Sequence, residues 1–106
     1  MLNVITTTRT RTYESGETVQ YTDWTVGGYT LRKTEEPGFT GWGVVNTNRD
    51  LPAIYDTSAF AEDAPVFGVN WSACGTKPAA DARAYAALLA TAADVADLFS
   101  RIAEDN

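Results

Sequence analysis

The stretch that decides the fold is residues 79–103, AADARAYAALLATAADVADLFSRIA, which lacks glycine and proline and is rich in alanine, the best helix former. Its large apolar side chains recur at intervals of three and four residues, as on one stripe of an α-helix. Pro78 precedes the stretch, and proline is favoured in the first helical turn. The pattern predicts a helix over residues 77–104 with one buried stripe. The residues of this stripe are Tyr85, Leu88, Leu89, Ala92, Val95, Phe99 and Ile102.

Upstream of the helix, residues 1–74 have the pattern of β-strands separated by turns. β-branched and aromatic residues, which suit a pleated sheet, alternate there with polar residues. Glycine at positions 16, 27–28 and 38 predicts tight turns, because glycine adopts positive φ without steric cost. The predicted strands are residues 3–13, 18–26, 29–34, 41–46, 53–56 and 65–73.

Together these elements predict an α+β fold in a single domain, residues 1–106, a length that suits one compact domain. We expect an antiparallel β-sheet of four to six strands, with one long C-terminal α-helix packed on one face. The sheet residues expected to face the helix are Leu31, Trp42, Val44, Phe67, Val69 and Trp71.

The composition excludes several kinds of chemistry. The chain has no histidine and one cysteine, which rules out Ser-His-Asp and Cys-His catalysis, histidine-bearing zinc sites and an internal disulfide. Cys74, close before the helix, has the features of a small buried residue at a strand end, with a reactive thiol as the alternative. Adjacent carboxylates such as Glu35-Glu36 lack the spacing of a calcium loop. No catalytic residue, metal site or cofactor is predicted.

The charge is negative and unevenly distributed. Net charge is -6, with four basic and three acidic residues in positions 1–34, and four basic and eleven acidic residues in positions 35–106. An acidic chain repels nucleic acid, so no nucleic-acid partner is expected. No signal-peptide pattern and no apolar run of membrane-spanning length is present, which favours a soluble, cytoplasmic protein without membrane contact.

Two surfaces are candidates for binding. Arg9 and Arg11 share one face of a predicted strand, and Arg32 and Lys33 of another strand could come near them. With Tyr13, Tyr21 and Trp24, these residues are candidates for a partner-binding surface or a shallow anion or nucleotide site. The alternative is that these arginines provide solubility and protect a sheet edge. On the helix, the small side chains of Ala86, Ala87 and Ala90 would permit a helix–helix contact in a homodimer, although alanine also suits any helix.

The C-terminal part also resembles a known group of sequences. The segments that carry the resemblance are VNWS (69–72), PAADARAYAALL (78–89) and AADVA (92–96), within the last 40 or so residues. They are similar to small proteins of actinobacteria and their phages, in which a strand is followed by an alanine-rich helix. The resemblance implies an accessory protein that acts in the host cytoplasm and binds a host factor, and it carries no catalytic residues.

These observations favour a non-enzymatic protein-interaction module, whose partner is another protein or a second copy of the chain. One alternative is a structural subunit for virion assembly or decoration. The other is a small-molecule or anion binder that uses the Arg9/Arg11 face of the sheet.

Overall fold

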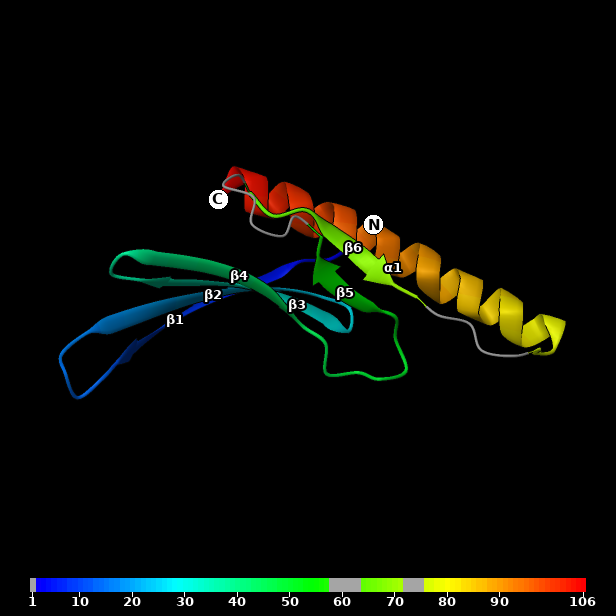
Figure 1. Ribbon diagram of the computed structural model, residues 1–106, viewed down its shortest axis with the longest axis horizontal. Coiled ribbons are helices and arrows are strands. Elements are labelled where there is room, and N and C mark those ends of the chain that lie inside the picture. Colours follow the sequence, from blue (N-terminus) through cyan, green and yellow to red (C-terminus); the bar gives the residue numbers. More distant parts are fainter. Residues whose placement is uncertain (1, 58–63, 72–75) are drawn as a thin grey trace. The chain divides into compact units, whose positions relative to one another are not determined.

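The computed structural model describes residues 2–57, 64–71 and 76–106 and has an α+β architecture, which confirms the predicted fold class (Figure 1). The chain divides into two compact units, Met1–Thr47 and Asn48–Asn106. The first unit holds an antiparallel four-stranded sheet, and the second holds a two-stranded sheet and the C-terminal helix. That the chain forms one domain stays a prediction. The elements are β1 (Ile5–Thr12), β2 (Thr18–Val26), β3 (Tyr29–Glu36), β4 (Phe39–Val45), β5 (Ala53–Asp56), β6 (Phe67–Asn70) and α1 (Ala79–Asp105).

The four strands of the first unit follow one another in sequence order, each antiparallel to the next. The three connecting turns contain glycine in the positive-φ region, with φ of 86° at Gly16, 57° at Gly27 and 77° at Gly38. This confirms the turn prediction. Strand β3 runs two residues beyond the predicted end, to Glu36, because Pro37 and Gly38 alone make the reversal and Glu36 pairs directly with Phe39.

The alternation of side chains gives this sheet two different faces. One face, which we call the tryptophan face, carries Trp24, Leu31 and Trp42 from the three neighbouring strands β2, β3 and β4. Leu31 is fully buried and Trp24 nearly so. The opposite face, which we call the arginine face, carries Arg9, Tyr21 and Arg32, and it contains the candidate site described below.

In the second unit, the helix packs on β6 and β5. The rings of Phe67 on β6 and Phe99 on α1 meet edge to face, with centroids 6.5 Å apart. Beside them, the Phe67 amide donates a hydrogen bond to Ser100 Oγ at 2.9 Å, and Ser100 Oγ donates to the Ala96 carbonyl oxygen at 2.9 Å. Ile54 on β5 is fully buried. The predicted contact of Phe67 with the helix is therefore confirmed.

The predicted buried stripe of the helix is correct only in its C-terminal half. Ala92, Val95 and Phe99 are buried, but Leu88 is 37% exposed and Tyr85 and Leu89 are half-buried. A helix of 27 residues is about 40 Å long, whereas the four-residue strands β5 and β6 extend about 13 Å, so this small sheet is far shorter than the helix.

Two further expectations differ from the structure. Trp71 is 66% exposed, so its predicted place in the core is wrong. The physical reason is that β6 ends at Asn70, the last residue that pairs with β5, and Trp71 lies beyond the hydrogen-bonded ladder. The helix begins at Ala79, two residues later than predicted, with Pro78 in the N-cap position and no side-chain cap.

Candidate functional site

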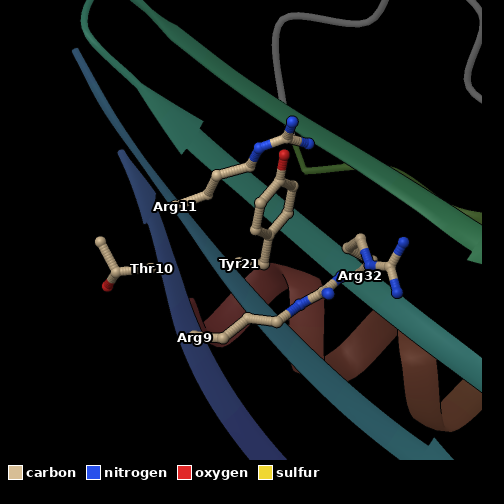
Figure 2. A pocket seen from close by; sticks show the side chains of 5 residues that line it. All are labelled: Arg9, Thr10, Arg11, Tyr21 and Arg32. Carbon is tan, nitrogen blue, oxygen red and sulfur yellow. The ribbon is translucent and has the colours of Figure 1, made fainter. Parts of the chain in front are cut away.

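The arginine face brings together four of the five residues predicted to bind a partner. Arg9 on β1 pairs with Tyr21 on β2, and Asp23, two residues further along β2, pairs with Arg32 on β3. Figure 2 shows the side chains of Arg9, Arg11 and Arg32 gathered around the ring of Tyr21, while Thr10 points away from it. Arg32 was considered only as a neighbour of Arg9 and Arg11, and it does lie on this face, whereas Lys33 lies on the opposite one. The alternation of side chains along β3 does not show which β2 residue lies opposite Arg32.

Tyrosine rings hold the three guanidinium groups in place. The central guanidinium carbon of Arg9 lies 4.8 Å from the centroid of the Tyr21 ring, and that of Arg32 lies 5.9 Å from the same ring. Arg11 lies 4.9 Å from the ring of Tyr13 in the same way. The electron-rich face of an aromatic ring attracts a cation, and a guanidinium seated there still has N–H donors directed outward. The face therefore presents positive charge in a partly ordered arrangement.

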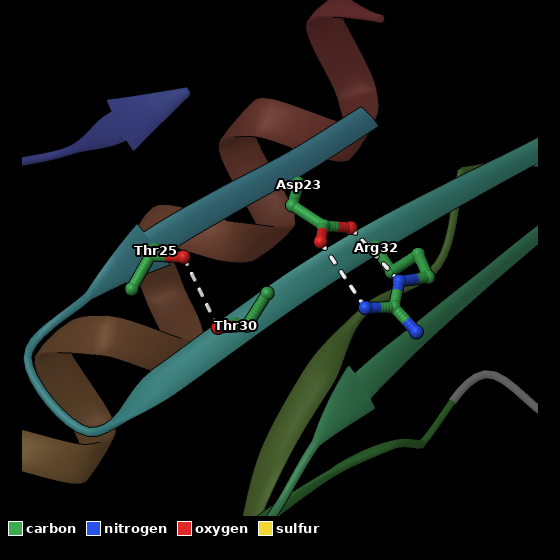
Figure 3. Close-up of polar contacts among 4 residues, drawn as sticks. All are labelled: Asp23, Thr25, Thr30 and Arg32. Atoms are coloured by element: carbon green, nitrogen blue, oxygen red, sulfur yellow. Dashed lines mark hydrogen bonds and ion pairs between the residues drawn. The ribbon is translucent and has the colours of Figure 1, made fainter. Parts of the chain in front are cut away.

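Arg32 differs from the other two arginines because it has a carboxylate partner (Figure 3). Its Nε donates to Asp23 Oδ1 at 2.9 Å and its Nη2 donates to Asp23 Oδ2 at 3.1 Å. These hydrogen bonds raise the pKa of Arg32, which keeps it charged. Within the described residues, the third nitrogen, Nη1, has no hydrogen-bond partner and is available to a ligand. Next to the pair, the hydroxyl groups of Thr25 and Thr30 are hydrogen-bonded at 3.1 Å.

Arg9 and Arg11 are exposed, and neither has a carboxylate within ion-pair distance among residues 2–57, 64–71 and 76–106. Both lie on β1, an edge strand in which all eight residues are exposed. In a chain of net charge -6, two guanidinium groups thus have no acidic partner within the part of the chain that the structure describes. This is the electrostatic feature that distinguishes the arginine face.

The two tyrosines of this face are linked as well. A hydrogen bond between the Tyr13 and Tyr21 hydroxyl groups is the main reason that the pKa of Tyr13 is raised above its ordinary value. Tyr13 is therefore a neutral phenol at physiological pH. Arginine side chains are also protonated throughout that range. Tyr13 and the arginines consequently supply hydrogen-bond donors and positive charge to this face.

Two hollows open on the arginine face. The first, of about 250 Å³, is lined by Arg9, Arg11, Tyr21 and Arg32, together with Thr10. The second, of about 390 Å³, is lined by residues of β3 and β4 and shares Arg32 with the first. We call it the glycine hollow, because Gly41 and Gly43 of β4 are among its lining residues. Sequence reasoning did not find this hollow: the two glycines are visible at positions 41 and 43, but the alternation of side chains does not show which residues surround them.

Trp24, the fifth predicted residue, lies on the tryptophan face instead. Its ring stacks on that of Trp42, with centroids 5.7 Å apart and an angle of 21° between the planes, and only 9% of Trp24 is exposed. The ammonium group of Lys33 lies 5.4 Å from the centroid of the Trp42 ring. Trp24 and Tyr21 are separated by three positions in one strand, and an odd separation places two side chains on opposite faces.

The remaining candidates lie elsewhere. Ala86, Ala87 and Ala90 are exposed on α1, and their dimer contact stays a prediction. Cys74 lies outside the described residues. Among the residues that the structure describes, no three histidine, cysteine or acidic side chains cluster as they would to hold a metal ion. In the same part of the chain, no helix has the length and apolar character needed to span a membrane.

Comparison with known proteins adds no relative. No protein-family model matches the chain, and neither the curated proteins nor the solved structures include a significant match. The functional argument therefore depends on the side chains of the arginine face.

Proposed function

We propose that this chain is a non-enzymatic protein-interaction module whose arginine face binds an acidic segment of a partner protein. The observation that carries the proposal is the pair of exposed guanidinium groups, Arg9 and Arg11, each seated on a tyrosine ring and without a carboxylate partner in the described chain. Arginine and tyrosine are enriched at protein interfaces and at the positions that dominate binding energy.

The chain's own composition supports an acidic ligand. Fourteen acidic residues stand against eight basic ones, yet four of these basic residues fall within positions 1–34. Long-range attraction of a strongly negative nucleic acid is disfavoured by the net charge of -6. A short acidic peptide segment carries fewer charges than a nucleic acid. At physiological salt, charges more than about 8–10 Å away are largely screened, so a bound peptide interacts mainly with the nearby arginines and not with the acidic remainder of the chain. The local positive charge therefore favours a protein partner.

The test uses a defined acidic probe and two matched double variants. The probe is an acetylated, amidated octapeptide of alternating glutamate and aspartate, added to isotopically labelled protein and followed by NMR chemical shifts. Arg9→Gln with Arg11→Gln removes two charges from the arginine face. Arg83→Gln with Arg101→Gln removes two charges from exposed positions of α1 and serves as the control.

We expect shifts in β1, β2 and β3, an affinity about tenfold lower in the Arg9/Arg11 variant, and unchanged affinity in the control. Equal loss in both variants, or shifts confined to other parts of the chain, would refute the proposal.

The partner itself is sought in an actinobacterial lysate, because the resemblance of residues 69–96 points to a phage or host protein of that group. We propose that both proteins meet in the host cytoplasm. Quantitative mass spectrometry of material captured by the tagged chain should show one protein that is depleted with the Arg9/Arg11 variant and retained with the Arg83/Arg101 variant. A protein captured equally by all three forms is not the partner of this face.

A second candidate is a structural subunit that assembles with copies of itself. The observation that favours it is β1, whose eight residues are all exposed and which pairs with β2 on one side only. An open strand edge is a template for pairing with another chain. Light scattering on purified protein tests this candidate: a defined multimer whose population rises with concentration supports it, and a monomer at every concentration contradicts it.

A further inference from the structure

The glycine hollow lies beside the charged part of the arginine face and has a different character. The register of β3 and β4 places Gly43 opposite Arg32 and Gly41 opposite Thr34, and Phe39 and Val45 occupy the same face of β4 on either side of the glycines. The floor is therefore bare backbone, flanked by an aromatic and an aliphatic side chain. A volume of about 390 Å³ lies in the range of small-ligand sites.

The two glycines contribute in different ways. A Cβ at Gly41 would lie 2.9 Å from Cε1 and Cζ of Phe39, so the Phe39 ring folds over this glycine. A Cβ at Gly43 would meet nothing within 4 Å, so the space above Gly43 is open. Phe39 itself is 55% exposed. The hollow is thus an open slot, with the Phe39 ring near one end and the Arg32 guanidinium at its border.

We infer that this slot receives an aromatic side chain of the same acidic segment that the arginine face binds, an inference that rests on the proposed function. An exposed aromatic wall and a glycine floor permit close approach of a flat ring, and a guanidinium plane stacks on such rings. Arg32 lines both hollows, so the two sites are adjacent. Its free Nη1 donors are available to a carboxylate next to the ring.

The spacing of the strands sets the spacing of the ligand's residues. Neighbouring strands are about 4.8 Å apart, so β1 and β4 are separated by about 14 Å. An extended peptide advances about 3.4 Å per residue, so this distance corresponds to about four residues. A segment that reaches Arg9 with an acidic side chain can therefore place an aromatic side chain in the slot four positions away, since an even separation keeps both side chains on the same face of an extended peptide.

The test compares two peptides on the full chain. The first is acetyl-EDGSWE-amide, in which tryptophan stands four positions after the first glutamate, and the second has alanine in place of tryptophan.

Two variants of the chain serve as tests of the slot. Gly43→Val fills the slot, since valine suits a strand and a Cβ meets no atom there. Thr40→Val, on the same strand but on the tryptophan face, is the control. Affinities are measured by NMR titration, and thermal unfolding checks each variant.

We expect the tryptophan peptide to bind the unaltered chain about tenfold more tightly than the alanine peptide, an advantage that Gly43→Val abolishes and Thr40→Val preserves. If both peptides bind equally and Gly43→Val changes neither affinity, the slot does not receive the ring, while the proposed function stands. If neither peptide binds, the proposed function fails, and the inference fails with it. Should Gly43→Val unfold, Phe39→Ala replaces it, because loss of the aromatic wall must also remove the tryptophan advantage.

Discussion

Arg32 and Asp23 form a two-point ion pair across neighbouring strands, with nitrogen–oxygen distances of 2.9 and 3.1 Å. The side chain of Asp23 is 17% exposed and that of Arg32 is 35% exposed, so the pair is partly accessible to solvent. Asp23 places a negative charge among the three arginines of the arginine face. It therefore competes with any acidic ligand for Arg32, and it lowers the positive potential that Arg9 and Arg11 produce.

Replacement of this carboxylate tests the competition directly. Asp23→Asn keeps the size of the side chain and removes its charge, so we expect the acidic octapeptide to bind about two- to fourfold more tightly, as expected for removal of one charge several ångströms from a solvated ligand. The free energy of unfolding should fall by about 1 kcal/mol or less, since the pair is partly exposed. Peptide titration and urea unfolding measure the two effects. A weaker affinity would instead show that Asp23 acts mainly by positioning Arg32.

Tyr13 gives a prediction for alkaline pH. In the folded chain the hydrogen bond with Tyr21 raises the pKa of Tyr13 above 10.0, and the unfolded chain has the ordinary value. The folded state therefore holds this proton more strongly. Its contribution to stability is present below pH 10 and is lost as pH rises through the pKa of the folded state. Tyr21→Phe removes the partner, so we expect Tyr13 to titrate at lower pH in that variant.

NMR of tyrosine labelled at Cζ follows each titration separately. Tyr29 is the internal control, because burial is the cause of its raised pKa and Tyr21→Phe leaves that burial unchanged. An unchanged Tyr13 titration in the variant would contradict the assigned hydrogen bond.

The faces of the strands were predictable from the sequence, because successive side chains of any extended strand point to opposite faces of the sheet. Arg9, Arg11 and Tyr21 were thus grouped correctly, whereas Trp24 was included through proximity along the chain and lies on the other face. The position of Arg32 beside Tyr21 and Asp23, and the glycine hollow, were not predictable. They depend on the register between strands, which the length of the Pro37-Gly38 turn determines, and a slip of one residue would reverse the face of every β4 side chain.

The second unit shows a different limit of prediction. Periodicity identified α1 almost to the residue, because helix propensity is local and residues 79–103 contain no helix breaker. Which part of the stripe is buried depends on what it packs against, and β5 and β6 are too short to cover the whole helix. Leu88 and Trp71 are therefore exposed although both are strongly apolar, and their apolar character alone did not predict their burial.

The unequal burial of the helix predicts unequal costs of substitution. Phe99 is fully buried and packs on Phe67, so Phe99→Ala should lower the free energy of unfolding by about 3–5 kcal/mol. Leu88→Ala, at an exposed position, should cost less than about 1 kcal/mol. Urea unfolding followed by helical circular dichroism measures both. Comparable costs would mean that the N-terminal turns of the helix are packed as tightly as the C-terminal ones.

Ser100 provides the last prediction, because its hydroxyl group joins the helix to β6. It accepts a hydrogen bond from the Phe67 amide and donates one to the Ala96 carbonyl oxygen. Both hydrogen bonds are partly buried. Ser100→Ala leaves the amide without its acceptor, so we expect the free energy of unfolding to fall by about 1–3 kcal/mol. Thr91→Ala is the matched control, since Thr91 Oγ1 also donates to a carbonyl oxygen one helical turn earlier, that of Ala87, but is exposed. Its cost should be below about 0.5 kcal/mol.

Hydrogen exchange of the Phe67 amide provides a second measurement. Exchange should accelerate in Ser100→Ala and stay unchanged in Thr91→Ala. Equal exchange rates in all three proteins would show that the hydrogen bond to Ser100 does not protect this amide.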